Sequence, residues 1–381
     1  MGHQTLTLSE PRSDRAVFVL DDACDIAGFE ALVSGQLTLS FAPSLEQRVR
    51  NGHETLCRAI ADGRHIYGIN TGFGALAGRM VDGDDLPTLQ KNLVYHLATG
   101  VGAPLSWAHG RALLLARLIV LSKGYSGCDV TLLALMRDVL NIGLSPVVPE
   151  KGTVGASGDL TPSSHMALAL MGEGAFIAKD GTRYDHLAAF DAFGMTPLVL
   201  KDREGLALVN GTSAMTGIAA LNAAKTARAL NLGLRSAAAY ADIMGARTEA
   251  YDAAFSMVRP HPGQTRAQEI LRDLLHGSTR LADQPIALQT AAGRISEGGE
   301  GAWPQDPYSL RCLPQIFGAV FDAVAFHDDI VARELHSVTD NPLIVADEPY
   351  ALHGGNFYGQ HVGFASDMIT TALIKLGVLL E

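Results

Sequence analysis

The chain has 381 residues, of which 48% are hydrophobic and 18% are charged, and its formal net charge is −11 at pH 7. This length allows two domains or one extended helical unit with a large core, and the negative charge, with no basic run, argues against a nucleic-acid or membrane-surface partner. The four cysteines lie far apart with no C-x-x-C pair, and the sequence has no apolar signal core or transmembrane run, so it indicates a reduced, cytoplasmic protein without a disulfide framework or a zinc site.

A glycine-rich loop follows a helix that the apolar spacing predicts from Ser44 to Ala61. Its sequence runs from His65 to Gly74 (HIYGINTGFG), and three glycines in seven residues exclude a regular element. The glycine spacing mimics a dinucleotide-binding fingerprint, but no strand precedes it. Tyr67 in this loop is, on the ordinary interpretation, a surface aromatic residue.

The next predicted helix, from Asp85 to Gly100, carries one imidazole on its apolar face. His96 shares that face with Leu93 and Leu97 at helical spacing. From one sequence alone, a core histidine with a local hydrogen-bond partner is the simpler interpretation. Further helices are predicted at 107–121 and 131–144.

The string from Gly152 to Pro162 (GTVGASGDLTP) places a serine between small residues directly before another helix. Thr161 suits the cap of that helix, and Pro162 suits its first turn. A serine-hydrolase elbow needs G-x-S-x-G, whereas Asp159 stands two residues after Ser157, so that assignment fails. Beyond this helix, a hairpin of short strands is predicted around Asp180-Gly181.

The small residues of this string allow a chemical alternative to an ordinary glycine-rich turn. In a tight turn the Gly158 nitrogen can approach the Ala156 carbonyl carbon and close a five-membered ring. Loss of water from the ring and from Ser157 leaves an exocyclic methylidene group. That group is an electrophile that none of the twenty side chains supplies.

Two long helices dominate the second half of the chain. Asn210 precedes an alanine-rich helix that is predicted to run to about Arg247, and a cap is its ordinary role. After a glycine-rich linker at 276–302, the string from Gln305 to Arg311 (QDPYSLR) opens the other helix, with Asp306 as its predicted cap. Tyr308 and Arg311 share a face of that helix. Because a cation near a helix N-terminus is disfavoured by the helix dipole, Arg311 suggests a functional role.

These strings, together with TDNP at 339–342 and HGGNF at 353–357, resemble the aromatic amino acid ammonia-lyase family. In that family the Ala-Ser-Gly triplet becomes 4-methylidene-imidazole-5-one (MIO). The resemblance implies a mainly α fold of the ammonia-lyase/fumarase-like type, with a long helical bundle and a smaller, loop-rich N-terminal part. We therefore predict an N-terminal part at 1–204, which holds the catalytic loop and the triplet, and a central helical bundle at 205–381. A homotetramer with sites shared between subunits is also implied.

The resemblance also assigns roles to individual residues. Tyr67 matches the base that removes the β-proton of the substrate, and Arg311 matches the arginine that holds the substrate carboxylate. The implied catalytic residues are Tyr67, Ala156, Ser157, Gly158 and Tyr308, and the implied substrate-binding residues are His96, Leu97, Asn210, Gln305, Arg311, Asn341 and Phe357. The segments at Ser157, Asn210 and Tyr308 each precede or open a helix, and three helix N-termini at one site would make it positive. No metal is predicted, because the histidines near the C-terminus lack ligand spacing and no H-E-x-x-H occurs.

The implied reaction is elimination of ammonia from an L-aromatic amino acid, with either the amine or the aromatic ring attacking MIO. The pair His96-Leu97 resembles the tyrosine-preferring members, so L-tyrosine and trans-p-coumarate are the expected substrate and product. Histidine or phenylalanine ammonia-lyase and tyrosine 2,3-aminomutase remain alternatives, as does an inactive helical fragment. Family members continue beyond the position of Glu381, so we expect the chain to be C-terminally truncated.

Overall fold

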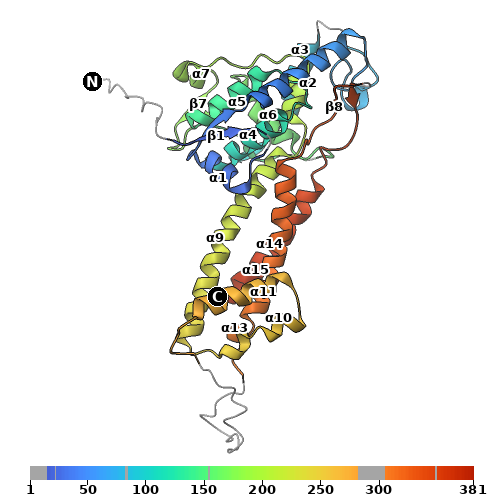
Figure 1. Cartoon of the computed structure of the whole chain (residues 1–381). Helices are drawn as coiled ribbons and strands as arrows, with labels where there is room; N and C mark the ends of the chain where they lie inside the picture. The colour runs from blue at the N-terminus through green and yellow to red at the C-terminus, as the bar shows by residue number, and fades with distance from the viewer. Residues whose placement is uncertain (1–14, 22, 82–84, 153–154, 282–304, 348–349) are drawn as a thin grey trace, which may run out of the picture. The chain divides into compact units, whose positions relative to one another are not determined.

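A computed structural model describes residues 15–21, 23–81, 85–152, 155–281, 305–347 and 350–381 (Figure 1). The chain divides into two compact units. Unit 1 comprises Met1–Leu221 and Val331–Val362, and unit 2 comprises Asn222–Ile330 and Gly363–Glu381. The fold is mainly helical, as the sequence predicted.

Unit 1 is built around α4, which is buried from Gly110 to Ser122. The helices of unit 1 include α1 (Ile26–Ser34), α2 (Pro43–Ala61), α3 (Leu86–Leu97), α4 (Trp107–Ser122), α5 (Val130–Ile142), α6 (Leu160–Leu170), α7 (Ala188–Phe193), α8 (Glu204–Val209) and the first turns of α9 (Ser213–Ile243). A 3-10 turn, η1 (Gly74–Leu76), lies between α2 and α3. Side-chain caps explain where some of them begin. Asp25 accepts the Gly28 N–H at 2.7 Å before α1, and Asp129 accepts the Thr131 N–H at 2.9 Å before α5.

Strands are short in unit 1, and the described residues form four small sheets. They pair as β1–β2 (Val17–Leu20 with Thr38–Phe41, parallel), β3–β5 (Val101–Pro104 with Pro149–Lys151), β4–β6–β7 (Ser145–Pro146, Ala175–Ile177, Arg183–Asp185) and β8–β9 (Leu343–Ile344 with Ala351–Leu352), the last three antiparallel. The predicted hairpin around Asp180-Gly181 is confirmed as β6–β7.

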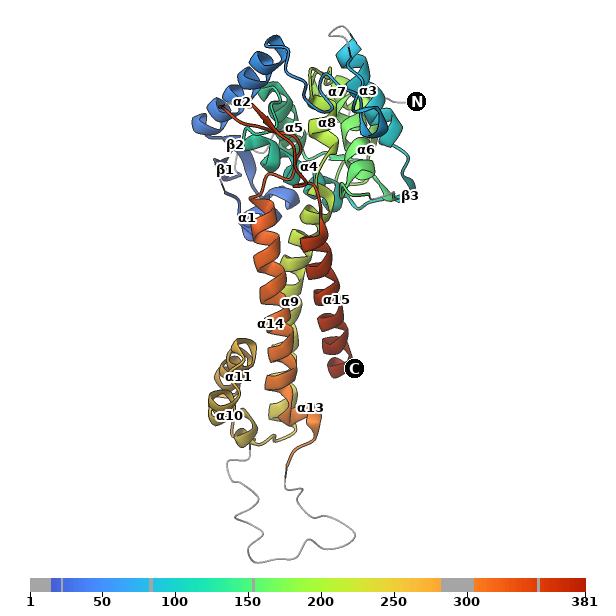
Figure 2. The ribbon, with the colours of Figure 1, turned by 90° about the vertical axis from the view of Figure 1, so that its right-hand side faces the viewer.

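Unit 2 consists of helices with an apolar core. The later turns of α9, most of α14 (Leu313–Leu335) and most of α15 (Gln360–Leu380) run side by side in both views (Figure 1 and Figure 2), with η3 (Thr248–Tyr251), α10 (Ala254–Val258), α11 (Pro262–Leu275) and α13 (Tyr308–Arg311). The core joins Leu230 and Leu234 of α9 to Phe317 and Phe321 of α14 and to Ile369 of α15. Packing of these apolar faces, rather than helix propensity alone, stabilises the long helices.

Several predicted helix boundaries need correction. The alanine-rich helix ends at Ile243 rather than near Arg247. The N-cap residue of α6 is Asp159 rather than the predicted Thr161, which lies inside the helix. Asp306 does not cap α13. Its carboxylate instead accepts the Arg247 N–H at 2.7 Å. The predicted linker at 276–302 lies largely outside the described residues.

Helix α13 is only four residues long, and Arg311 is its last residue. A cation at a helix C-terminus is favoured by the dipole. The argument that dipole conflict marks Arg311 as functional is therefore wrong, and its role has to be argued on other grounds.

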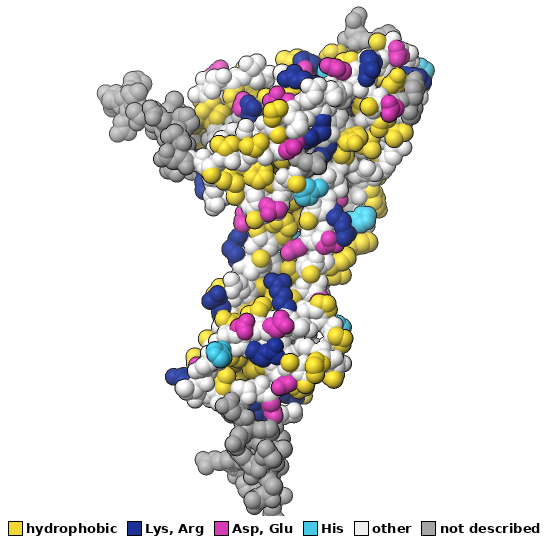
Figure 3. All heavy atoms as spheres, viewed as in Figure 1, with side chains coloured by type: hydrophobic (Ala, Val, Ile, Leu, Met, Phe, Trp, Pro, Cys, Tyr) yellow, Lys and Arg dark blue, Asp and Glu magenta, His cyan; other side chains and the backbone are white. Residues whose placement is uncertain are grey.

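Exposed apolar side chains are frequent on α15. Among the described residues, α15 alone is long and apolar enough to cross a membrane by length and composition, a test that core helices of soluble proteins also pass. Phe364, Ile374 and Val378 are 63%, 64% and 61% exposed. Figure 3 shows hydrophobic side chains mixed with charged ones over the viewed surface.

Candidate active site

The Ser157 hydroxyl is buried and held by a second segment of the chain. It donates to Oδ1 of Asn210 at 2.8 Å and accepts the Gly211 N–H at 3.2 Å. Ser157 is 8% exposed and Asn210 is 6% exposed. Asn210 ends α8 and lies shortly before α9, so two helix junctions meet at this hydroxyl.

The backbone of the triplet is tightly folded. The Gly155 N–H donates to the Ser157 carbonyl at 3.3 Å, and the Gly158 N–H donates to the Phe357 carbonyl at 3.1 Å. A Cβ atom on Gly158 would lie 3.3 Å from the Gly211 carbonyl oxygen, so a larger residue would crowd that segment. Ala156 is exposed. Thr153 and Val154 of the predicted string lie outside the described residues.

Asp159 follows the triplet and caps α9 from outside that helix. Its Oδ2 accepts the Met215 N–H at 2.9 Å, and its side chain is buried. Burial raises the pKa of this carboxyl to about 7, a rise that the negative charge of Glu334 adds to and that N–H groups of α9 oppose. Sequence reasoning used Asp159 only to exclude a hydrolase and missed its position, because a cap supplied by a distant segment leaves no local pattern.

Asn210 is positioned by a loop that includes Asn341. Its amide nitrogen donates to the Asn341 carbonyl at 3.1 Å and to Asp340 Oδ1 at 3.3 Å. Asn341 Oδ1 in turn accepts the Gly354 N–H at 2.7 Å. The structure thus brings together the predicted residues Ser157, Asn210 and Asn341, with Phe357 contributing its carbonyl.

Behind Asn210 lies a fully buried ion-pair cluster that the sequence analysis missed. Arg203 binds both Asp340 carboxylate oxygens at 2.9 Å, and Arg117 lies 3.6 Å from Oδ2 of the same carboxylate. Two guanidinium groups therefore face one carboxylate behind Asn210. Arg117 interrupts the apolar run of α4, and an arginine in a buried helix needs a partner. The arginine within this apolar run was the sequence feature that could have indicated a buried ion pair.

Side chains from other elements hold the Tyr67 loop in place. Gly68 has a φ of +68°, and a Cβ there would lie 2.7 Å from Leu206 Cδ2, so only glycine suits the position. Gln90 of α3 is buried, donates to the Gly68 carbonyl at 2.9 Å and accepts the Leu206 N–H at 2.9 Å. Through Gln90 the loop is joined to α8, the helix that ends at Asn210.

The Tyr67 side chain is half-buried, with its oxygen bound to backbone. The hydroxyl oxygen accepts the Gly74 N–H at 3.1 Å, and the ring meets Phe73 edge to face with 6.3 Å between centroids. The Tyr67 N–H donates to Nε2 of His353 at 3.3 Å. These contacts fix the position of the phenolic oxygen within the loop.

His96 is exposed on α3, and Leu97 is half-buried. The buried face of α3 carries Leu86, Gln90 and Val94 instead. The interpretation of His96 as a core histidine is therefore wrong for this chain, because its imidazole points away from the core of unit 1.

Gln305, Tyr308 and Arg311 belong to unit 2, whereas the Ser157 site belongs to unit 1. Tyr308 is 71% exposed, and the Arg311 guanidinium carbon lies 4.4 Å from the centroid of its ring. The two side chains therefore share a face, as their spacing predicted. The Arg311 Nε atom is buried and has no hydrogen-bond partner among the described residues.

A sequence model of the aromatic amino acid lyase family matches residues 24–381. The chain belongs to this family. That membership makes it a carbon–nitrogen lyase, and it confirms the family, the enzyme class and the fold class predicted from the motifs.

Curated members of the aromatic amino acid lyase family differ in the substrates they are named for. The chain is 46% identical to the tyrosine ammonia-lyase of Cereibacter sphaeroides over 366 residues, covering 95% of the chain and 69% of the relative. It is 39% identical to the histidine ammonia-lyase of Myxococcus xanthus over 382 residues, covering 98% of the chain and 70% of that relative.

A solved structure has the same fold. The tyrosine aminomutase of Streptomyces globisporus superposes with a TM-score of 0.88 and is 31% identical, covering 94% of the chain and 68% of that protein. The family and fold are therefore shared across proteins whose names give different substrates and different reactions.

Proposed function

We propose that this lyase eliminates ammonia from L-tyrosine to give trans-p-coumarate, using MIO formed from Ala156-Ser157-Gly158. The observation that carries the proposal is the Ser157 hydroxyl, buried and held between Asn210 at 2.8 Å and the Gly211 N–H at 3.2 Å. A hydroxyl that must leave as water is held in one orientation by this pair.

The residues around the triplet fit the cyclised group. The Gly155 N–H already folds back to the Ser157 carbonyl at 3.3 Å, and the Gly158 backbone packs closely against the Gly211 carbonyl, so the triplet is held in a tight turn. Asn210 and the Gly211 N–H would hold the group at the position where they now hold the hydroxyl. Once formed, MIO supplies an electrophile for the amino group of the substrate.

Tyr67 is our candidate for the base that removes the β-proton. A phenol acts as a base at neutral pH only where its surroundings favour the phenolate. The Gly74 N–H donates to the phenolic oxygen at 3.1 Å. Gln90 keeps the loop in place, so the phenolic oxygen is pre-positioned before substrate binds.

Arg311, with Gln305 and Tyr308, is our candidate for the carboxylate site. A guanidinium fork binds both oxygens of a carboxylate at once. The Arg311 Nε atom has no hydrogen-bond partner among the described residues, which leaves a donor for an incoming anion. We propose further that the enzyme acts as a homotetramer, because α15 exposes Phe364, Ile374 and Val378 and such apolar side chains call for a protein partner.

The choice of tyrosine rests on His96 and on the relative with 46% identity, which is named a tyrosine ammonia-lyase. An imidazole can bond the phenolic hydroxyl of the substrate, whose burial without a partner would cost roughly 1–3 kcal/mol. The exposed position of His96 leaves it free to face a substrate. The likeness to a tyrosine aminomutase makes isomerisation to β-tyrosine the second candidate.

The test is to incubate the chain separately with L-tyrosine, L-phenylalanine and L-histidine and to identify the products by chromatography. We expect p-coumarate from tyrosine as the main product, and no product from Ser157→Ala. Ser163→Ala, which removes another buried hydroxyl close in sequence, is the matched control and should retain activity. β-Tyrosine as the main product would favour the aminomutase, and urocanate or cinnamate as the preferred product would overturn the assignment to tyrosine.

A further inference from the structure

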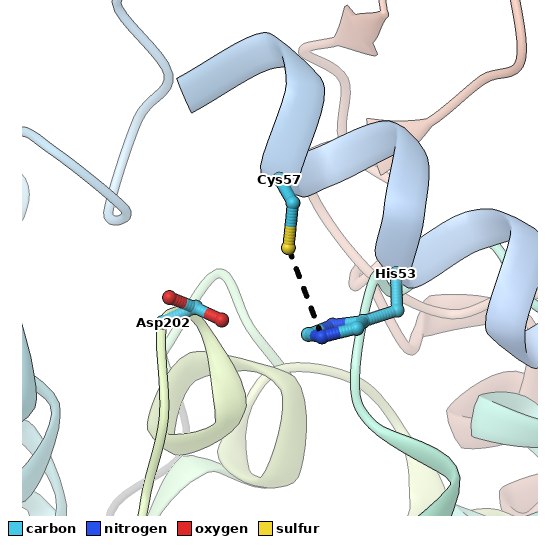
Figure 4. A group of neighbouring side chains, drawn as sticks. All are labelled: His53, Cys57 and Asp202. Carbon is cyan, nitrogen blue, oxygen red and sulfur yellow. Dashed lines mark hydrogen bonds between the residues drawn. The ribbon is translucent and has the colours of Figure 1, made fainter. Parts of the chain in front are cut away.

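Three metal-binding side chains converge on the surface of unit 1, away from any residue assigned to the reaction. His53 and Cys57 lie four residues apart on α2, so they share one face of that helix. Asp202, just before α8, points toward them (Figure 4). One ligand atom from each residue lies within 4.8 Å of the other two.

The hydrogen bonds of His53 leave one ring nitrogen available to a metal. Its Nδ1 lies 3.1 Å from the Gly127 carbonyl oxygen, which can only accept a hydrogen bond. Nδ1 therefore carries the proton, and Nε2 presents its lone pair toward the Cys57 sulfur. Metal-binding histidines are commonly oriented in this way, by a backbone carbonyl behind the ring.

The spacing of the side chains suits a tetrahedral ion. Zinc–ligand distances of about 2.3 Å to sulfur and 2.0–2.1 Å to nitrogen put these two atoms about 3.6 Å apart in a tetrahedral site. The Cys57 Sγ and His53 Nε2 atoms are 3.7 Å apart. In a tetrahedral site the carboxylate oxygen would lie about 3.4–3.6 Å from the histidine nitrogen and from the cysteine sulfur. The Asp202 oxygen lies within 4.8 Å of both atoms, so only this carboxylate would have to move inward.

The charges around the thiol favour a cation. The carboxylates of Asp202, Asp129 and Glu54 all act on the Cys57 thiol, so the surroundings of this sulfur are negative. The Lys201 ammonium, on the residue before Asp202, is bound to Asp129 at 3.2 Å. Cys57 is exposed, so an ion can reach the site.

We propose that His53, Cys57 and Asp202 bind one Zn²⁺ ion, with water as the fourth ligand. On binding, the Cys57 S–H bond breaks, its proton goes to solvent and a zinc–sulfur bond forms, with no change of oxidation state. The ion would connect α2 to the segment that leads into α8. Because Arg203 is the next residue after Asp202 and binds Asp340, zinc would stabilise the part of unit 1 that supports Asn210.

The test measures Zn²⁺ binding by tag-free chain in competition with a chromogenic chelator, and then Co²⁺ binding by absorbance. We expect one equivalent of Zn²⁺ per chain, a thiolate-to-cobalt charge-transfer band, and a higher melting temperature with zinc. Cys57→Ser should remove the band and weaken zinc binding by at least about tenfold, and Asp202→Asn should weaken zinc binding while retaining the band.

Cys312→Ser is the matched control, since it removes a partly exposed thiol of unit 2, and it should bind both metals as the wild type does. The wild-type protein settles the outcome even if a variant unfolds. Absence of a charge-transfer band in the wild type, or a band and affinity that survive Cys57→Ser, would overturn the site.

Discussion

The Ser157 site and the Tyr308–Arg311 segment are built on opposite principles. At Ser157 the hydroxyl, Asn210 and Asp340 are buried and bind one another or the backbone. At α13 Tyr308 is 71% exposed, and a buried Arg311 nitrogen has no partner among the described residues. The first region is organised by the chain itself, whereas the second presents groups that a ligand or another polypeptide can satisfy. Mutations that break the buried ion pair of Asp340 in the first region should therefore cost stability, whereas mutations in the second region should cost catalysis with little loss of stability.

Removing Arg203 should have the largest effect on stability. Arg203→Ala leaves the Asp340 carboxylate buried without its bidentate partner, which should lower the free energy of unfolding by about 3–5 kcal/mol. Urea denaturation measures the change. Arg183→Ala removes a surface pair with Asp185 at 2.8 Å and should change stability by about 1 kcal/mol or less. Equal losses of unfolding free energy in the two variants would contradict the conclusion that the chain itself holds the Ser157 region together through buried pairs.

The pH dependence of stability tests the buried cap on α9. Because burial raises the folded-state pKa of Asp159 to about 7, above an unfolded value of about 3.9, the folded protein holds the proton more tightly between these values. The contribution of Asp159 to stability is therefore full below about pH 4 and falls as pH rises toward 7, by at most about 4 kcal/mol.

Asp159→Asn keeps an acceptor for the Met215 N–H and removes the titration. Stability curves from pH 4 to 7 should therefore decline less steeply in this variant than in the wild type. Asp185→Asn, at an exposed position, should follow the wild-type curve. Parallel curves for wild type and Asp159→Asn would mean that this carboxyl titrates as it would in water.

Arg311→Ala tests the second region, the Tyr308–Arg311 segment, where we expect an effect on catalysis rather than on stability. Loss of charge-assisted hydrogen bonds to a substrate carboxylate should cost roughly 1.5–3 kcal/mol, or about one to two decades in kcat/KM. The free energy of unfolding should change little. Arg266→Ala, which removes a similar stacking contact with Phe321 at 4.8 Å, is the control and should leave kcat/KM unchanged. Unchanged kinetics in Arg311→Ala would place this arginine outside the carboxylate site.

His96→Phe should have the narrowest effect, confined to substrate preference. Filling the position with an apolar ring should lower the ratio of tyrosine to phenylalanine kcat/KM by roughly tenfold to a hundredfold. His276→Phe, on the surface of unit 2, should leave the ratio unchanged. A ratio that does not move in His96→Phe would show that the imidazole does not contact the substrate.

Sequence reasoning identified the family, because the motifs that mark it are strings of adjacent residues. The Ala156-Ser157-Gly158 triplet, Tyr67 and Asn210 each stand in a recognisable string, and the family assignment followed from those strings. It failed where partners are far apart in the chain. Nothing near Arg203 predicts that Asp340 lies within 2.9 Å, 137 residues later.

One further failure has a local physical cause, and the proposed zinc site lay outside the reach of the sequence patterns. The argument from the helix dipole assumed a long helix from Asp306 onward, but α13 ends after Arg311 and a new helix begins at Leu313. The search for metal ligands required histidine and cysteine pairs at familiar spacings. His53 and Cys57 share a helix face at a spacing of four residues, but their third partner, Asp202, is brought near only by the fold.

The measurement that tests the central claim most directly is the intact mass of the purified chain, with its near-ultraviolet spectrum. Our account predicts a mass two water molecules below the encoded value and an absorbance that Ser157→Ala lacks, because the hydroxyl held by Asn210 is lost when the triplet cyclises. An encoded mass in the wild type, with a spectrum that matches the Ser157→Ala variant, would contradict the proposal that this site forms MIO.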